Sequence, residues 1–159
     1  MVVKCTKYFL IICLSLIMTT LSGCSDSQAE PEKKVVQEGS MNKKVSMVQE
    51  RRKDGMSALH GVMLKQITNY AKYKKYTTSL ADLKSVIDED GRIESDKRFY
   101  KVAAVECSGK SITECVSLIA TPQGEQAEMD KECATLTYNS MGEKGRSGTA
   151  KVEECWAVY

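Results

Sequence analysis

The sequence predicts an α+β domain in which one long N-terminal amphipathic helix packs on a four-stranded antiparallel sheet. Apolar residues recur at helical spacing between residues 41 and 76. Runs rich in β-branched and aromatic residues follow in the second half of the chain and are separated by turn residues. With 159 residues and 42% hydrophobic content, the chain suits one globular domain.

The first 23 residues have the pattern of an export signal. Lys4 and Lys7 precede an apolar run that is short for a membrane span and ends at residues 21–24, Leu-Ser-Gly-Cys. This motif resembles a bacterial lipobox, which implies cleavage before Cys24 and acylation of that cysteine. In the families that sort lipoproteins by the next residue, Ser25 implies the outer membrane. We therefore expect a lipoprotein signal peptide at 1–23 and a lipid anchor on Cys24.

Residues 24–40 are polar and predict a flexible tether to a globular domain at 41–159. Cleavage removes two lysines and leaves 21 basic and 21 acidic residues, so the exported chain is balanced in charge. Basic residues are nevertheless concentrated in one segment. Residues 43–76 contain nine lysines and arginines against Glu50 and Asp54. This basic helix face is either a solvated surface or a site for DNA or anionic headgroups.

The helix is predicted over residues 41–76 from a single apolar stripe. Gly55 and Gly61 lower its intrinsic propensity by about 1 kcal/mol each relative to alanine, so the helix depends on packing against the sheet. The stripe recurs at steps of three or four residues and consists of Met56, Leu59, Met63, Ile67 and Tyr70.

Four strands are predicted, at residues 99–107, 112–121, 133–138 and 151–159. Residues 108–111, Ser-Gly-Lys-Ser, suit a turn between the first two strands. A flexible glycine-rich loop at 139–150 connects the last two strands. Alternation in this terminal hairpin places Leu136 and Trp156 on one face and Cys133 and Cys155 on the other.

The exported domain contains four cysteines, which permit three pairings. Export to an oxidising envelope favours disulfides. We favour Cys107 with Cys115 and Cys133 with Cys155, because each pair flanks one predicted hairpin, although the sequence leaves the connectivity open. The cysteines include no close Cys-x-x-Cys pair, so a zinc site is disfavoured. We expect no metal and no cofactor.

The sequence offers no catalytic constellation. His60 is the only histidine, and neither a Gly-x-Ser-x-Gly elbow nor a phosphate-loop pattern is present. We therefore expect a non-enzymatic protein with no small-molecule substrate. Three cations near the terminal loop are a candidate contact for DNA or another anion, namely Lys144, Arg146 and Lys151.

Two passages resemble the soluble domain of type IV pilins and their minor-pilin relatives. Residues 76–83 are similar to the segment that follows the pilin helix. The second passage is similar to the closing strands and disulfide-bounded region of pilins. It consists of residues 120–124 and 133–138, the Gly142 turn, and Cys155 with Trp156. The N-terminus departs from this pattern, because pilins keep a long apolar helix after a short leader, whereas here the residues after the cleavage motif are polar. The resemblance therefore implies a pilin-like domain that does not enter a filament as an ordinary pilin does.

These observations favour a lipid-anchored envelope protein whose pilin-like domain is an interaction module for a type IV pilus or a related secretion or uptake machinery. Pilus or secretion-system proteins are the expected partners, together with the membrane. One alternative is a DNA-binding receptor of a DNA-uptake pilus, motivated by the basic residues and by the DNA-binding minor pilins of the resembling family. A second alternative is a minor pilin-like adhesin.

Overall fold

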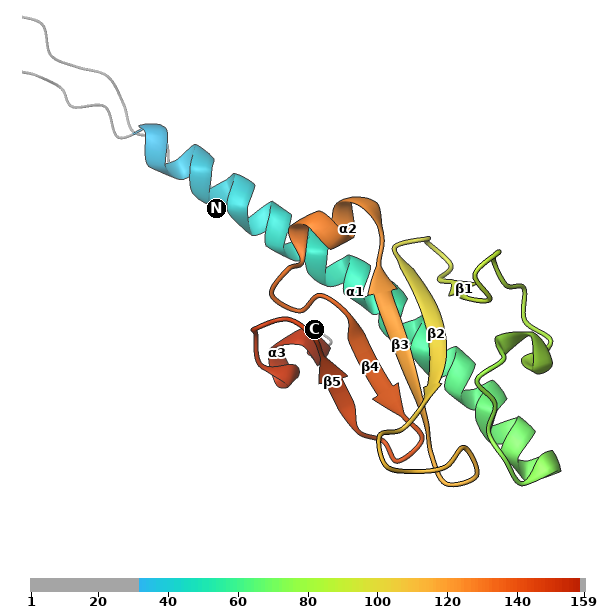
Figure 1. Ribbon diagram of the computed structural model, residues 1–159. Coiled ribbons are helices and arrows are strands. Elements are labelled where there is room, and N and C mark those ends of the chain that lie inside the picture. The colour runs from blue at the N-terminus through green and yellow to red at the C-terminus, as the bar shows by residue number, and fades with distance from the viewer. Residues whose placement is uncertain (1–31, 158–159) are drawn as a thin grey trace, which may run out of the picture.

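The computed structural model describes residues 32–157, with side chains from residue 42 onward. The predicted signal peptide, Cys24 and Ser25 lie outside these residues. The chain begins with α1 (Glu32–Tyr73), a helix of 42 residues against which a sheet packs (Figure 1). Within the described residues, no helix combines the length and the apolar character that a membrane span needs.

α1 begins within the segment that the sequence predicts as a tether. Residues 24–40 are predicted as a flexible tether, but the chain is helical from Glu32. Glutamate, lysine and glutamine are strong helix formers, so a polar segment rich in them does not need to be a loop. Among the described side chains of α1, Val48 is the first that is buried, and the helix before it projects beyond the sheet (Figure 1).

The sheet has five strands where the sequence predicts four. Each strand pairs antiparallel with the next one along the chain, in the order β1-β2-β3-β4-β5. The first two predicted strands correspond to β2 and β3, and the third corresponds to β4. The strands are β1 (Ile93–Glu94), β2 (Tyr100–Glu106), β3 (Val116–Pro122), β4 (Leu136–Asn139) and β5 (Lys144–Arg146).

The end of the chain departs most from the prediction. The segment predicted as a final strand forms a short helix, α3 (Val152–Trp156), and β5 is the returning strand of the terminal hairpin. Glu153 and Glu154 occupy the first turn of α3, where the helix dipole favours acidic side chains. In a window this short, the apolar spacing fits a helix as well as a strand. A further short helix, α2 (Gly124–Met129), lies between β3 and β4.

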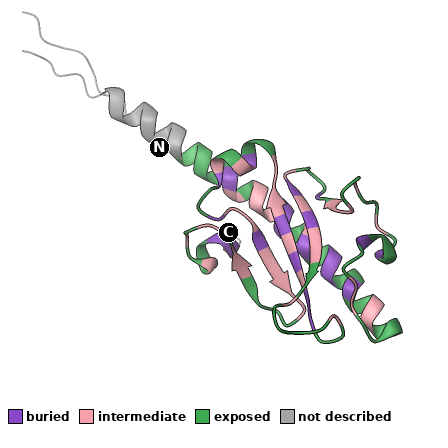
Figure 2. Ribbon diagram, viewed as in Figure 1, coloured by how far each residue is buried: buried purple, intermediate pink, exposed green. Residues whose placement is uncertain are grey.

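The side of α1 that faces the sheet carries its buried residues (Figure 2) and is rotated slightly from the predicted stripe. Met56 and Leu59 are buried as predicted, but Ile67 is 52% exposed and Gln66 is buried instead. The Gln66 amide donates to the Thr77 carbonyl oxygen at 2.6 Å and accepts from the Thr77 N–H at 3.0 Å. Because the amide nitrogen and oxygen of Gln66 both have hydrogen-bond partners, this polar side chain can occupy a core position. The strands contribute Tyr100, Val102, Val116, Leu118, Ala120 and Leu136 to the core.

Gly55 allows the ring of Tyr100 to pack directly on α1. A Cβ atom at residue 55 would lie 2.8 Å from two atoms of that ring. We expect Gly55→Ala to lower the free energy of unfolding by about 1–3 kcal/mol, because the ring and the helix must move apart. Gly61→Ala is the matched control, since residue 61 has open space around it and alanine should stabilise the helix by up to about 1 kcal/mol. Urea denaturation followed by circular dichroism measures both effects, and equal effects would contradict the packing argument.

Disulfides join Cys107 to Cys115 and Cys133 to Cys155, which are the two pairs that the sequence favours. Cys133 precedes β4, whereas Cys155 lies in α3. The second bridge therefore ties the terminal helix to the segment that precedes β4. The hairpin register instead predicts a bridge that crosses two neighbouring strands.

The segment after β5, residues 147–150, is held in place by the backbone before β4. The N–H groups of Gly148 and Ala150 donate to the carbonyl oxygens of Cys133 and Glu132, at 3.1 Å and 2.9 Å. A side chain at residue 148 would collide with the Glu132 carbonyl. Glycine is needed here for a close approach of two backbones, and the predicted flexible loop is an ordered part of the domain.

Candidate nucleic-acid interface

The three cations predicted near the terminal loop have different surroundings. Arg146 lies on β5, and its Nη1 donates to the Gly148 carbonyl oxygen. Lys144 is exposed on the same strand, with its Nζ 5.1 Å from the centre of the Trp156 ring. Lys151 is exposed at the residue before α3. The Arg146 guanidinium is therefore hydrogen-bonded within the domain. Lys144 and Lys151 are the two exposed cations of the predicted set.

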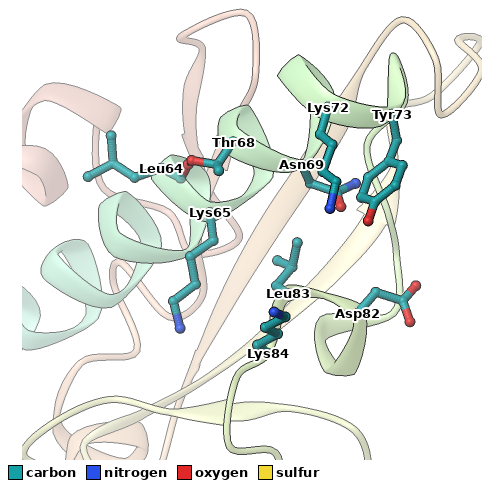
Figure 3. A pocket seen from close by; sticks show the side chains of 9 residues that line it. All are labelled: Leu64, Lys65, Thr68, Asn69, Lys72, Tyr73, Asp82, Leu83 and Lys84. Carbon is teal, nitrogen blue, oxygen red and sulfur yellow. The ribbon is translucent and has the colours of Figure 1, made fainter.

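A second group of cations surrounds a hollow at the C-terminal end of α1 (Figure 3). The hollow has a volume of about 390 Å³ and lies between α1 and η1 (Leu80–Leu83), a short 3-10 helix. Lys65 and Lys72 project from α1, and Lys84 is the residue that directly follows η1. We call these three lysines the helix-end cluster. Asp82 is the one carboxylate that lines the same hollow within the described chain.

The helix-end cluster carries positive charge that is not neutralised by ion pairs. Among the described residues, no carboxylate oxygen lies within 4 Å of its three ammonium groups. Lys65 instead donates to the Ser85 hydroxyl at 2.9 Å. In the middle of α1 the basic side chains are paired, Arg51 with Glu125, Arg52 with Asp130 and Lys53 with Glu50. The unpaired lysines among the described residues of α1 therefore lie toward its two ends, Lys43 and Lys44 at one and Lys65 and Lys72 at the other.

An exposed tyrosine lies beside one lysine of the cluster. The Nζ of Lys72 is 4.9 Å from the centre of the Tyr73 ring, and the ring residue is 56% exposed. A hydrogen bond between the two side chains raises the pKa of Lys72 and lowers the pKa of Tyr73. Ammonium groups contact phosphates and aromatic rings stack on bases, so this combination suits a nucleic acid.

Sequence reasoning finds only part of this cluster. Lys65 and Lys72 belong to the predicted basic helix face, but Lys84 joins them only because the chain turns back after α1. The stacking of Tyr76 on Tyr70, with ring centres 4.6 Å apart, accompanies this reversal. In the sequence, the signal for this chain reversal is the pair Tyr70 and Tyr76, which flank the end of α1.

The acidic turn at residues 88–91 is engaged within the protein. Asp88 accepts hydrogen bonds from the Arg92 N–H at 2.8 Å and lies 2.7 Å from the Lys101 Nζ. The bond from Lys101 is the largest cause that lowers the pKa of Asp88 to about 2. Across residues 32–157, no group of three or more histidine, cysteine, aspartate or glutamate side chains is arranged to hold a metal ion.

A family model described as "Type IV minor pilin ComP, DNA uptake sequence receptor" matches residues 44–137. The matched segment runs from α1 into β4 and contains the helix-end cluster, but it ends before β5 and α3. No curated protein matches the chain. The match covers more than half of the 159 residues and confirms the resemblance to minor pilins. The chain therefore belongs to the type IV minor pilin ComP family, and this membership fits a pilus-associated, non-enzymatic pilin-like domain and implies a location in the cell envelope.

Proposed function

We propose that this protein is a DNA-binding receptor that works with a type IV pilus, and that the helix-end cluster contacts the DNA backbone. The observation that carries the proposal is the set of three lysines around one hollow, without acidic partners among the described residues. The description of the family as a DNA uptake sequence receptor supports the same function.

Lysine ammonium groups recognise phosphates as point charges, so the cluster positions DNA without reading its sequence. Each phosphate that is neutralised releases condensed counterions, and binding should therefore weaken steeply as salt rises. Tyr73 offers a ring at the rim of the same hollow for contact with a sugar or base.

Replacing the helix-end cluster tests this function directly. We expect the triple variant Lys65→Gln, Lys72→Gln, Lys84→Gln to bind duplex DNA on the order of 100-fold more weakly at low salt, because three phosphate contacts are lost. The slope of log affinity against log salt concentration should fall by about three, one for each lysine. Fluorescence anisotropy with a labelled duplex measures both quantities.

A matched control keeps the number of removed charges constant. Lys43, Lys44 and Lys131 are exposed cations near the other end of the domain, and their triple glutamine variant should bind DNA nearly as well as the wild type.

The variant Lys144→Gln, Arg146→Gln, Lys151→Gln tests the DNA contact that is predicted from the sequence at the terminal hairpin. If only this variant loses binding, the interface lies at the terminal hairpin. If all three variants bind equally, neither cluster contacts DNA.

We also propose that the protein is anchored by lipid on Cys24, in the outer membrane. The lipobox-like residues 21–24 and the serine at residue 25 support this anchor. Metabolic labelling with an alkyne fatty acid should label the wild-type chain, and Cys24→Ala should abolish the label and release the protein from the membrane fraction. Cys13→Ala is the control, because that cysteine lies in the segment removed by cleavage. A wild-type chain without label, or equal labelling of Cys24→Ala, would exclude the anchor.

A further inference from the structure

A second hollow lies between α1 and the terminal hairpin. It has a volume of about 320 Å³ and is lined by residues from three elements. Its walls are Lys53, Met56, Ser57 and His60 from α1, Lys144 from β5 and Trp156 from α3. Lys144 and Trp156 follow residue 137, where the family match ends. The family model therefore describes only one wall of this hollow.

The hollow is built on a rigid base. The Trp156 Nε1 donates to the Gly145 carbonyl oxygen at 2.9 Å, and the neighbouring Cys155 is bonded to Cys133. The His60 ring meets the Tyr138 ring edge to face, with ring centres 5.0 Å apart. These contacts connect α1, β4, β5 and α3. The elements that carry the polar groups of the hollow are therefore held against one another before a ligand arrives.

The polar groups that line the hollow suit an anion. Two ammonium groups, a histidine ring and a hydroxyl supply hydrogen-bond donors, and no carboxylate is among the residues that line it in the described chain. The Lys144 Nζ lies 5.1 Å from the centre of the Trp156 ring and has no carboxylate oxygen of the described residues within 4 Å. Lys53 has one partner, Glu50, but both side chains are partly exposed, and such surface pairs contribute little.

We propose that this hollow binds a phosphate group, held between Lys53 and Lys144 and hydrogen-bonded by Ser57 and His60. Charge-assisted hydrogen bonds from ammonium groups to phosphate oxygens are among the strongest in proteins. The phosphate is either free orthophosphate or part of a nucleic-acid backbone; for the second source, the inference rests on the proposed DNA-binding function. In that case the hollow is a second anchoring point for the backbone, separate from the helix-end cluster.

The only tryptophan of the chain reports on this hollow directly, because Trp156 forms one wall. We expect its fluorescence to change saturably when orthophosphate or duplex DNA is added to the full chain, with ionic strength held constant by chloride. Lys144→Gln should raise the half-saturating concentration at least about tenfold, because a charged contact is lost. Lys53→Gln, on the opposite wall, should have the same effect. Lys131→Gln is the control, since that exposed lysine does not line the hollow, and it should leave the curve unchanged.

Each result separates this inference from the proposed function. A saturable change with orthophosphate that persists in the helix-end triple variant supports the phosphate site whether or not DNA binds. A change with DNA alone, lost in Lys144→Gln, assigns the site to a phosphodiester. No saturable change with either ligand overturns the proposal. The same half-saturation in the wild type, Lys144→Gln and Lys53→Gln also overturns it.

Discussion

Replacing Asp130 with alanine is expected to lower the free energy of unfolding by about 3–5 kcal/mol, because the change leaves the partly buried Arg52 without its counter-charge and the buried Gln126 amide without one of its acceptors. The Arg52 Nε and Nη2 donate to the two carboxylate oxygens of Asp130, each at 2.7 Å. Gln126, which is fully buried, donates to the same carboxylate at 2.9 Å. Burial alone would lower the pKa of Arg52, but the bond to Asp130 and its negative charge raise it above its usual range. This pair connects α1 to α2.

The neighbouring arginine supplies the control for this prediction. The Arg51 Nη2 lies 2.8 Å from the Glu125 carboxylate, but the Glu125 side chain is 77% exposed, whereas that of Asp130 is 1% exposed. Glu125→Ala should therefore cost only about 0–1 kcal/mol. Urea denaturation followed by far-ultraviolet circular dichroism compares the two variants. Similar losses in both would show that burial does not determine the strength of these pairs.

The double variant Cys133→Ala, Cys155→Ala is expected to lower the free energy of unfolding by about 3 kcal/mol, in the chain-entropy estimate for a loop of this length. The two cysteines are separated by 22 residues and are buried. Their bond holds α3 against the sheet, so its loss should also expose Trp156 to water. A shift of tryptophan emission to longer wavelength, at low denaturant, measures that exposure.

The other disulfide is the matched control for the tryptophan signal. Cys107 and Cys115 are separated by 8 residues and close the connection between β2 and β3. Cys107→Ala, Cys115→Ala should cost about 2.5 kcal/mol by the same estimate but leave the emission of Trp156 unchanged. An unshifted emission in the Cys133 and Cys155 variant would show that α3 is held mainly by packing.

The sequence predicts those parts of the fold that have a strong, long pattern. The stripe with Met56 and Leu59 predicts α1, and the alternating runs predict β2 and β3, because these segments bury apolar side chains over several turns or residue pairs. The terminal residues give no such signal. Lys144-Gly145-Arg146 forms an edge strand without apolar alternation, and five residues of α3 fit either period. Backbone pairing and the bond to Cys133 decide their structure.

The candidate sites are less predictable than the fold, because they join residues that are distant in the chain. Lys84 enters the helix-end cluster through the reversal after α1, and Lys144 meets Lys53 only across the packed sheet and helix. Composition shows that basic residues gather in 43–76 but does not show which are paired. The ion pair of Arg52 with Asp130 removes one of them from the surface, and this information exists only in the folded chain.

Because α1 is long, charges at one of its ends interact little with charges at the other end. From Glu32 to Lys72 the helix rises about 60 Å at 1.5 Å per residue. The Debye length at physiological ionic strength is about 8 Å, so charges near one end are screened from charges near the other. With the proposed anchor on the N-terminal side of α1, DNA held at the helix-end cluster does not feel repulsion from anionic headgroups around the lipid. The affinity of the anchored protein for DNA should therefore equal that of the same chain released from the membrane.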